Sequence, residues 1–113
     1  MKANRPNRPA RRSDGRVVGT FDGTTLWLKR KRSRHLYRAL DAWCVDVATL
    51  IRAADAGVQF VAIEDTETGE TYEVGLEDFL NFGVVIDHGF GTQVALPLAY
   101  WSRSSALQLR FGI

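Results

Sequence analysis

Cysteine is almost missing from this sequence. Cys44 is the only one in 113 residues, so the chain has no disulfide framework and no cysteine-based metal cluster. No apolar run is long enough to span a membrane, and the basic N-terminus is not followed by the apolar segment of a secretion signal. One free thiol is compatible with a reducing compartment, so we expect a cytoplasmic protein without a membrane partner.

Catalytic and cofactor motifs are also missing. The two histidines, His35 and His88, have no zinc-ligand spacing, and neither a GxxxxGK[ST] nor a GxGxxG phosphate motif occurs. No nucleophile lies beside a base in a known pattern, and Cys44 is expected to pack as a small hydrophobic residue. We therefore expect no metal, no cofactor and no catalysis.

Charge is present in abundance but very unevenly distributed. Residues 1–38 carry twelve lysines and arginines against two aspartates, a net charge of +10. Residues 39–113 carry three arginines against eleven acidic residues, a net charge of −8. Such asymmetry indicates either an external charged partner or one half of the chain neutralising the other.

The first fifteen residues are rich in arginine, proline and asparagine, with no large apolar side chain to anchor them. Such a segment buries too little surface to offset its ordering entropy. The sequence therefore predicts a basic disordered tail over 1–15 and a single α+β domain over 16–113. Arg11 and Arg12 would form the part of a mobile arm nearest the domain.

The longest periodic stretch is 33–56. Its apolar residues recur at helical spacing, which predicts one long amphipathic helix that begins after Ser33 and ends at Gly57. The other elements are shorter. A hairpin is expected over 16–29, where Asp22-Gly23 separates two runs of strand-forming residues through a turn with positive φ. A second hairpin is expected over 58–74, with a glycine turn at Thr68-Gly69 and a first strand in the interior of the sheet.

The remaining chain predicts a short helix at 76–81, strands at 84–86 and 92–98, and a final strand over 107–113. Pro97 indicates that the second of these strands lies at an edge or ends there. The expected fold is thus one long helix packed on an antiparallel or mixed sheet of about six or seven strands, with one short helix.

The strongest functional signal is the basic run at the start of the expected helix. Cations oppose the helix dipole there, and a bound anion would relieve that cost. We expect a small nucleic-acid-binding accessory protein, for DNA or RNA, that contacts phosphates through a basic patch. The patch would comprise Arg11, Arg12, Lys29, Arg30, Lys31, Arg32, Arg34 and Arg38. Stacking on bases would come from Trp27, His35, Tyr37 or Phe90.

The alternative is a protein-interaction module. The chain would form a homodimer whose basic region meets its own acidic hairpin, or it would present an acidic surface over 64–87 to a basic partner protein. The non-functional interpretation is that both charged regions are solvated surfaces that keep the protein soluble.

Overall fold

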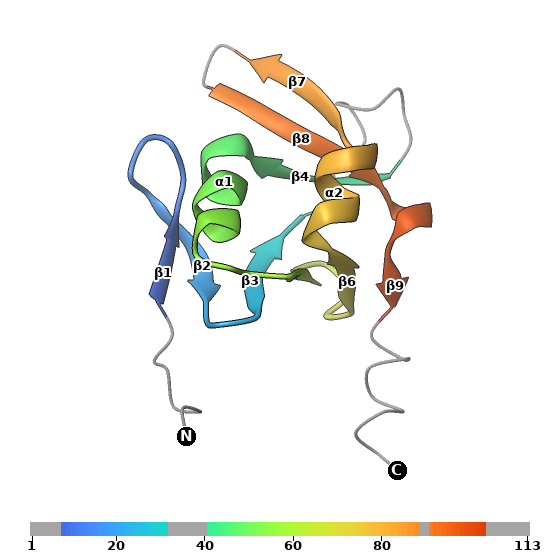
Figure 1. The fold of residues 1–113 in the computed structure, drawn as a ribbon. Helices are drawn as coiled ribbons and strands as arrows, with labels where there is room; N and C mark the ends of the chain where they lie inside the picture. The colour runs from blue at the N-terminus through green and yellow to red at the C-terminus, as the bar shows by residue number, and fades with distance from the viewer. Residues whose placement is uncertain (1–7, 32–40, 89–90, 104–113) are drawn as a thin grey trace.

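The computed structural model describes residues 8–31, 41–88 and 91–103, and in them the chain forms two sheets around a shared core (Figure 1). The larger sheet has six strands in the order β1-β2-β3-β5-β6-β9, and the smaller has three in the order β4-β8-β7. In Figure 1 the smaller sheet is at the top, with the two helices between it and the larger sheet. The strands are β1 (Arg8–Arg11), β2 (Val17–Phe21), β3 (Thr25–Arg30), β4 (Ala42–Asp46), β5 (Phe60–Asp65), β6 (Thr71–Gly75), β7 (Val84–His88), β8 (Gly91–Pro97) and β9 (Ser102–Arg103). The helices are α1 (Val47–Asp55) and α2 (Leu76–Phe82).

The prediction of one long helix on a sheet is wrong: the fold is mostly β, with two helices of modest length. Within the expected helix, Ala42–Asp46 is instead the strand β4, and all five of its side chains are buried. Asp46 then caps α1 by accepting a hydrogen bond from the amide of Ala48. A strand that is buried on both faces has no polar alternation, so its apolar residues can also fit a helical stripe. Residues 32–40, the start of the expected helix, lie outside the described part of the chain.

Both predicted hairpins are confirmed. β2 pairs with β3 so that Phe21 faces Leu26, and β5 pairs with β6 so that Ile63 faces Tyr72. Gly69 has φ +78°, as the second turn requires. Gly23 is not among the glycines with positive φ. The first turn is instead closed by Asp22, whose carboxylate accepts hydrogen bonds from the amides of its neighbours.

β5 lies inside the larger sheet, as predicted, because it pairs in parallel with β3 on its other side. The crossover between these parallel strands contains β4 and α1. The core combines apolar side chains from both sheets and both helices, and its largest fully buried members are Trp43, Phe79, Leu26 and Leu50. Trp101 is also buried and contacts the rings of Trp43 and Phe79 edge-on.

The expected tail does not extend over 8–15. Arg8–Arg11 forms β1, which pairs with β2 in antiparallel register, and Ala10 is 2 % exposed and belongs to the core. The short helix and the two following strands are confirmed, and Pro97 is the last residue of β8. The expected final strand over 107–113 lies outside the described residues.

Candidate nucleic-acid interface

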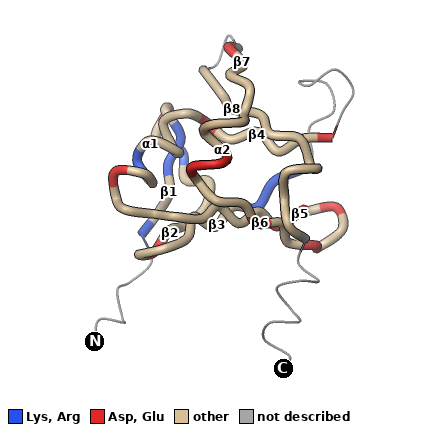
Figure 2. Tube along the Cα trace, turned by 45° about the vertical axis from the view of Figure 1, so that its right-hand side comes forward, with Lys and Arg blue, Asp and Glu red and all other residues tan. Residues whose placement is uncertain are grey.

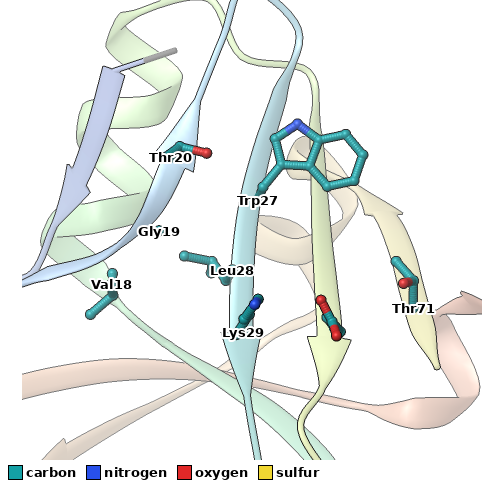
Figure 3. A pocket seen from close by; sticks show the side chains of 8 residues that line it. Val18, Gly19, Thr20, Trp27, Leu28, Lys29 and Thr71 are labelled. Carbon is teal, nitrogen blue, oxygen red and sulfur yellow. The ribbon is translucent and has the colours of Figure 1, made fainter. Parts of the chain in front are cut away.

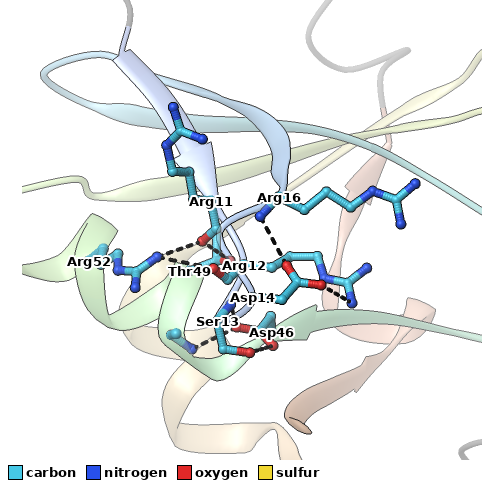
Figure 4. A network of polar contacts seen from close by, with 9 residues as sticks. Arg11, Arg12, Ser13, Asp14, Arg16, Asp46, Thr49 and Arg52 are labelled. Carbon is cyan, nitrogen blue, oxygen red and sulfur yellow. Dashed lines mark hydrogen bonds and ion pairs between the residues drawn. The ribbon is translucent and has the colours of Figure 1, made fainter. Parts of the chain in front are cut away.

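The turn between β1 and β2 and its flanks carry Arg11, Arg12 and Arg16, and Arg52 of α1 reaches the backbone of this turn (Figure 4). The turn closes through hydrogen bonds from the Arg12 amide to the Arg16 carbonyl and from the Gly15 amide to the Arg12 carbonyl, each 2.9 Å long. Gly15 has φ +88°, a conformation that glycine adopts without strain. The Asp14 carboxylate accepts from the Arg16 amide at 3.0 Å, and the Arg11 guanidinium donates to the Gly15 carbonyl at 2.9 Å.

Side chains of helix α1 and of its N-cap residue hold this turn in place. The carboxylate of Asp46 accepts from the amide of Ser13 at 3.1 Å and from its hydroxyl at 3.2 Å. The Thr49 hydroxyl donates to the Arg11 carbonyl at 2.8 Å. The Arg52 guanidinium donates to the carbonyls of Arg11 and Arg12, both at 3.2 Å. The arginines are therefore carried on a backbone that is fixed by side chains from a distant part of the sequence.

The charges of this group are only partly balanced. We call Arg11, Arg12, Arg16 and Arg52 the arginine surface. Arg12 forms an ion pair with Asp14 at 3.1 Å. Among the described residues, the other three have no carboxylate partner within ion-pair distance. Figure 2 shows these basic positions on one side of the molecule, around β1 and α1.

Within the described part of the predicted basic run, Lys29 and Arg30 do not share one face of the sheet. Lys29 and Arg30 are the last two residues of β3, where side chains alternate between the two faces of the sheet. Lys29 is exposed, whereas Arg30 is half-buried on the side of the core. Burial lowers the pKa of Arg30, and nearby Arg12 lowers it further, although Cys44 and Asp46 act in the opposite direction. Arginine remains charged despite such a shift because its ordinary pKa is so high.

Lys31 shows that the acidic hairpin already meets part of this run. Its ammonium lies 3.8 Å from the carboxylate of Glu67, on the turn between β5 and β6. Both side chains are exposed, so the pair contributes at most about 1 kcal/mol to stability. This contact lies within one chain, whereas the charge-paired homodimer required it between two chains.

The supposed conflict between cations and the helix dipole is not present in α1. That helix begins at Val47, and its N-cap is the acidic residue Asp46. Arg32, Arg34 and Arg38 lie outside the described residues, as do three of the expected stacking residues, His35, Tyr37 and Phe90.

Trp27, the remaining stacking residue, is 45 % exposed on the outer face of the larger sheet. Its ring lies beside a groove of about 340 Å³ that is also lined by Lys29, Glu64 and Thr71 (Figure 3). Lys29 and Glu64 are direct neighbours in the register of β3 and β5, yet they form no ion pair. The groove therefore offers an aromatic face, a cation and an anion to an incoming ligand.

Sequence reasoning missed Arg16 and Arg52 and misjudged the setting of Arg11 and Arg12. One signal was available, because Asp14-Gly15 is the same dipeptide that marked the next hairpin. No local sequence signal indicated the role of Arg52, because its hydrogen-bond partners Arg11 and Arg12 lie 41 and 40 residues earlier in the chain.

Within the described residues, no three His, Cys, Asp or Glu side chains come close enough to hold a metal ion, and no helix is long and apolar enough to cross a membrane. No protein-family model matches the chain, and no curated protein matches it. A similar fold occurs in the solved structure of a nuclease from a fusselovirus, with a TM-score of 0.52 and 10 % sequence identity. The match covers 80 % of this chain and 57 % of the nuclease chain, so this chain corresponds to little more than half of that protein. At this identity the likeness concerns the fold alone.

Proposed function

We propose that the protein binds nucleic acid and contacts phosphates through the arginine surface. The observation that carries this proposal is the gathering of four guanidinium groups around one turn with a single carboxylate pair among them. A phosphate backbone that lies across this surface would accept charge-assisted hydrogen bonds from guanidinium groups that have no carboxylate partner among the described residues.

Preorganisation strengthens the proposal. Because Asp46 and Thr49 hold the turn in place, little conformational entropy is lost when a ligand binds there. Contacts of this type supply affinity and position, with little sequence specificity. The fold shared with a nuclease agrees with an association with nucleic acids, but it is support by analogy, since one fold hosts many functions.

Trp27 extends the proposed interface to unpaired bases. An exposed indole beside a groove gives a base a stacking platform, and Lys29 is close enough to that ring to line the same groove. Single-stranded DNA or RNA is thus the ligand for which both features are useful. The protein acts in this proposal as an accessory that holds the strand, with no chemical step of its own.

Binding is best measured by fluorescence anisotropy with labelled single-stranded DNA, single-stranded RNA and duplex DNA at low and moderate salt. On a duplex, each phosphate contact contributes about 0.9 to the slope of log affinity against log salt concentration. The double variant Arg11→Glu/Arg16→Glu should therefore bind more weakly and show a slope smaller by about 2.

The matched control is Lys29→Glu/Lys31→Glu, which changes the net charge by the same amount on the other basic segment. It should retain the salt slope of the wild-type protein on duplex DNA. Equal losses of duplex affinity in the two double variants would show that binding depends on net charge and not on the arginine surface. Absence of binding by the wild-type protein at low salt would refute the function itself.

A further inference from the structure

The outer face of the larger sheet carries a groove that is open to solvent. Both helices lie on the other face of this sheet, between the two sheets (Figure 1). The groove has a volume of about 340 Å³ and is lined by Trp27, Lys29, Glu64 and Thr71, among others. This volume lies at the lower end of the range for small-molecule sites, which is about 300–1,000 Å³. The groove is therefore large enough to receive a compact group such as a nucleic-acid base.

The indole of Trp27 covers the strand beside it and leaves one of its faces open. Trp27 is a direct neighbour of Ala62 in the register of β3 and β5, so both side chains belong to the outer face of the sheet. Ala62 is only 1 % exposed, whereas Trp27 is 45 % exposed. Figure 3 shows the indole extending from β3 across the neighbouring strand, which explains how Ala62 is covered. A base can stack on the open face of the ring, but stacking alone accepts every base.

Two side chains of opposite charge follow on the same two strands. Lys29 and Glu64 are neighbours in register, two residues after Trp27 and Ala62, and so they lie on the same face. Both are exposed, and neither side chain forms a hydrogen bond or ion pair with another described residue. An ammonium and a carboxylate are thus available beside the stacking surface. Because a carboxylate repels phosphate, its use in a groove that binds a strand is to accept hydrogen bonds from a base.

The bases differ in the donors on their Watson–Crick edges. Guanine presents two adjacent donors, its ring N–H and its amino group, next to a carbonyl acceptor. Adenine, cytosine and thymine or uracil each present a single donor group on that edge. The two oxygens of a carboxylate match the paired donors of guanine, and an ammonium matches the carbonyl beside them.

We propose that this groove recognises an unpaired guanine. The ring stacks on Trp27, the Glu64 carboxylate accepts from the two donors, and the Lys29 ammonium donates to the carbonyl. This inference rests on the proposed function and adds to it the identity of the base that the strand presents.

The groove is continuous with the arginine surface. Val18 lines the groove, and Arg16 precedes it by two residues, between β1 and β2. A strand that places a base in the groove can therefore lay its neighbouring phosphates against the guanidinium groups. The groove itself is lined by one cation and one anion, Lys29 and Glu64, which suits an uncharged base better than a phosphate.

The test uses single-stranded oligothymidylate with one guanine at its centre. Strands with adenine, cytosine or thymine at the same place are compared with it in anisotropy titrations. Wild type should bind the guanine strand about fivefold more tightly or better, which is the lower end of the discrimination that a bidentate contact gives. Hypoxanthine at that place lacks the amino group of guanine, so its strand should bind with intermediate affinity.

Glu64→Gln should remove the preference for guanine, because an amide has a single acceptor oxygen and its amino group opposes the donors of the base. Glu77→Gln is the matched control: it makes the same charge change at an exposed position on α2 and should keep the preference. Equal affinity of wild type for all four strands would overturn the proposal and leave the proposed function in place. A preference that survives Glu64→Gln would do the same.

Nucleoside 5′-monophosphates separate the groove from strand binding. They can be titrated against the fluorescence of Trp27, which is exposed, whereas Trp43 and Trp101 are buried. Guanosine monophosphate should reach half-maximal quenching at a lower concentration than the other three. If no strand binds at low salt, the proposed function fails, and this assay decides the inference by itself. A preference for guanosine monophosphate would then support a guanine site whose ligand is the free nucleotide, and equal affinities would overturn it.

Discussion

The carboxylate of Asp46 joins helix α1 to the β1–β2 turn by accepting both the amide and the hydroxyl of Ser13, at 3.1 and 3.2 Å. The same carboxylate caps α1 through the amide of Ala48 at 3.1 Å. One buried side chain therefore starts the helix and positions the segment that carries the arginine surface.

Replacing Asp46 by alanine should lower the free energy of unfolding by about 2 kcal/mol or more. The loss combines a helix cap, worth about 1 kcal/mol, with two further hydrogen bonds to Ser13. Urea denaturation measures it. Asp46→Asn should lose less because an amide oxygen can still cap, and Asp55→Ala at the exposed end of the same helix should change stability little. An Asp46→Ala protein as stable as wild type would show that the turn is held elsewhere.

The two buried tryptophans should respond differently to replacement by phenylalanine. The indole N–H of Trp101 donates to the Leu96 carbonyl at 3.1 Å, whereas that of Trp43 has no hydrogen-bond partner among the described residues. Trp101→Phe should therefore be the more destabilising by about 1 kcal/mol, because it removes a buried hydrogen bond, whereas the Trp43 indole has none to lose among the described residues. Thermal unfolding of the two variants provides the comparison. The opposite order would mean that the cavity at Trp43 outweighs the hydrogen bond.

Gly19 and Gly15 should differ in their tolerance of alanine. A Cβ at Gly19 would collide with the Trp27 carbonyl oxygen on the paired strand, so Gly19→Ala should cost about 3 kcal/mol or more. A Cβ at Gly15 meets nothing within 4 Å, and only its φ of +88° opposes the change. Gly15→Ala should cost about 1–2 kcal/mol. Urea midpoints of the two variants test the ranking.

Asp22 should contribute a small acid-sensitive share of stability. The amide of Thr24, followed by that of Thr25, donates to its carboxylate and lowers the pKa of Asp22 below its ordinary value of 3.8. A lowered folded-state pKa means that this contribution is present above pH 3.8 and is lost as the pH falls through the folded-state pKa. The stability difference between wild type and Asp22→Asn should therefore shrink in that acidic range. A difference that is constant with pH would contradict the assignment.

Trp27 should matter for unpaired strands and not for duplexes. Stacking contributes about 1–3 kcal/mol per base, so Trp27→Ala should weaken binding to single-stranded DNA or RNA by about tenfold or more. Its duplex affinity and its salt slope should not change, because phosphate contacts are retained. Phe60→Ala removes another exposed aromatic ring from the same strand pair, outside the groove, and serves as the control in anisotropy titrations. Equal losses in both variants would argue against the groove.

The elements that the sequence predicted correctly are local ones. The hairpins of β2–β3 and β5–β6 and the helix α2 follow from turn residues and short periodic runs that lie within about fifteen residues of one another. β4 was not predictable in this way, because its five buried residues have no polar alternation. Its partner strand β8 is also distant: β4 ends at Asp46, and β8 begins 45 residues later, at Gly91.

The candidate interface was only half predictable for a related reason. Composition identifies arginine as the important residue type, but the position of each guanidinium depends on contacts such as that between Thr49 and Arg11, which are 38 residues apart. The alternation along β3 also separated Lys29 from Arg30, which the sequence run had placed together.

The pairing of β4 with β8 also bears on how the chain is made. During synthesis β4 leaves the ribosome well before β8, and until then its apolar residues have no strand to join. Fragments that end before residue 91 should thus aggregate or be captured by chaperones, and complete folding should await the C-terminal third. Such long-range pairing also predicts slow refolding relative to helical proteins of this size.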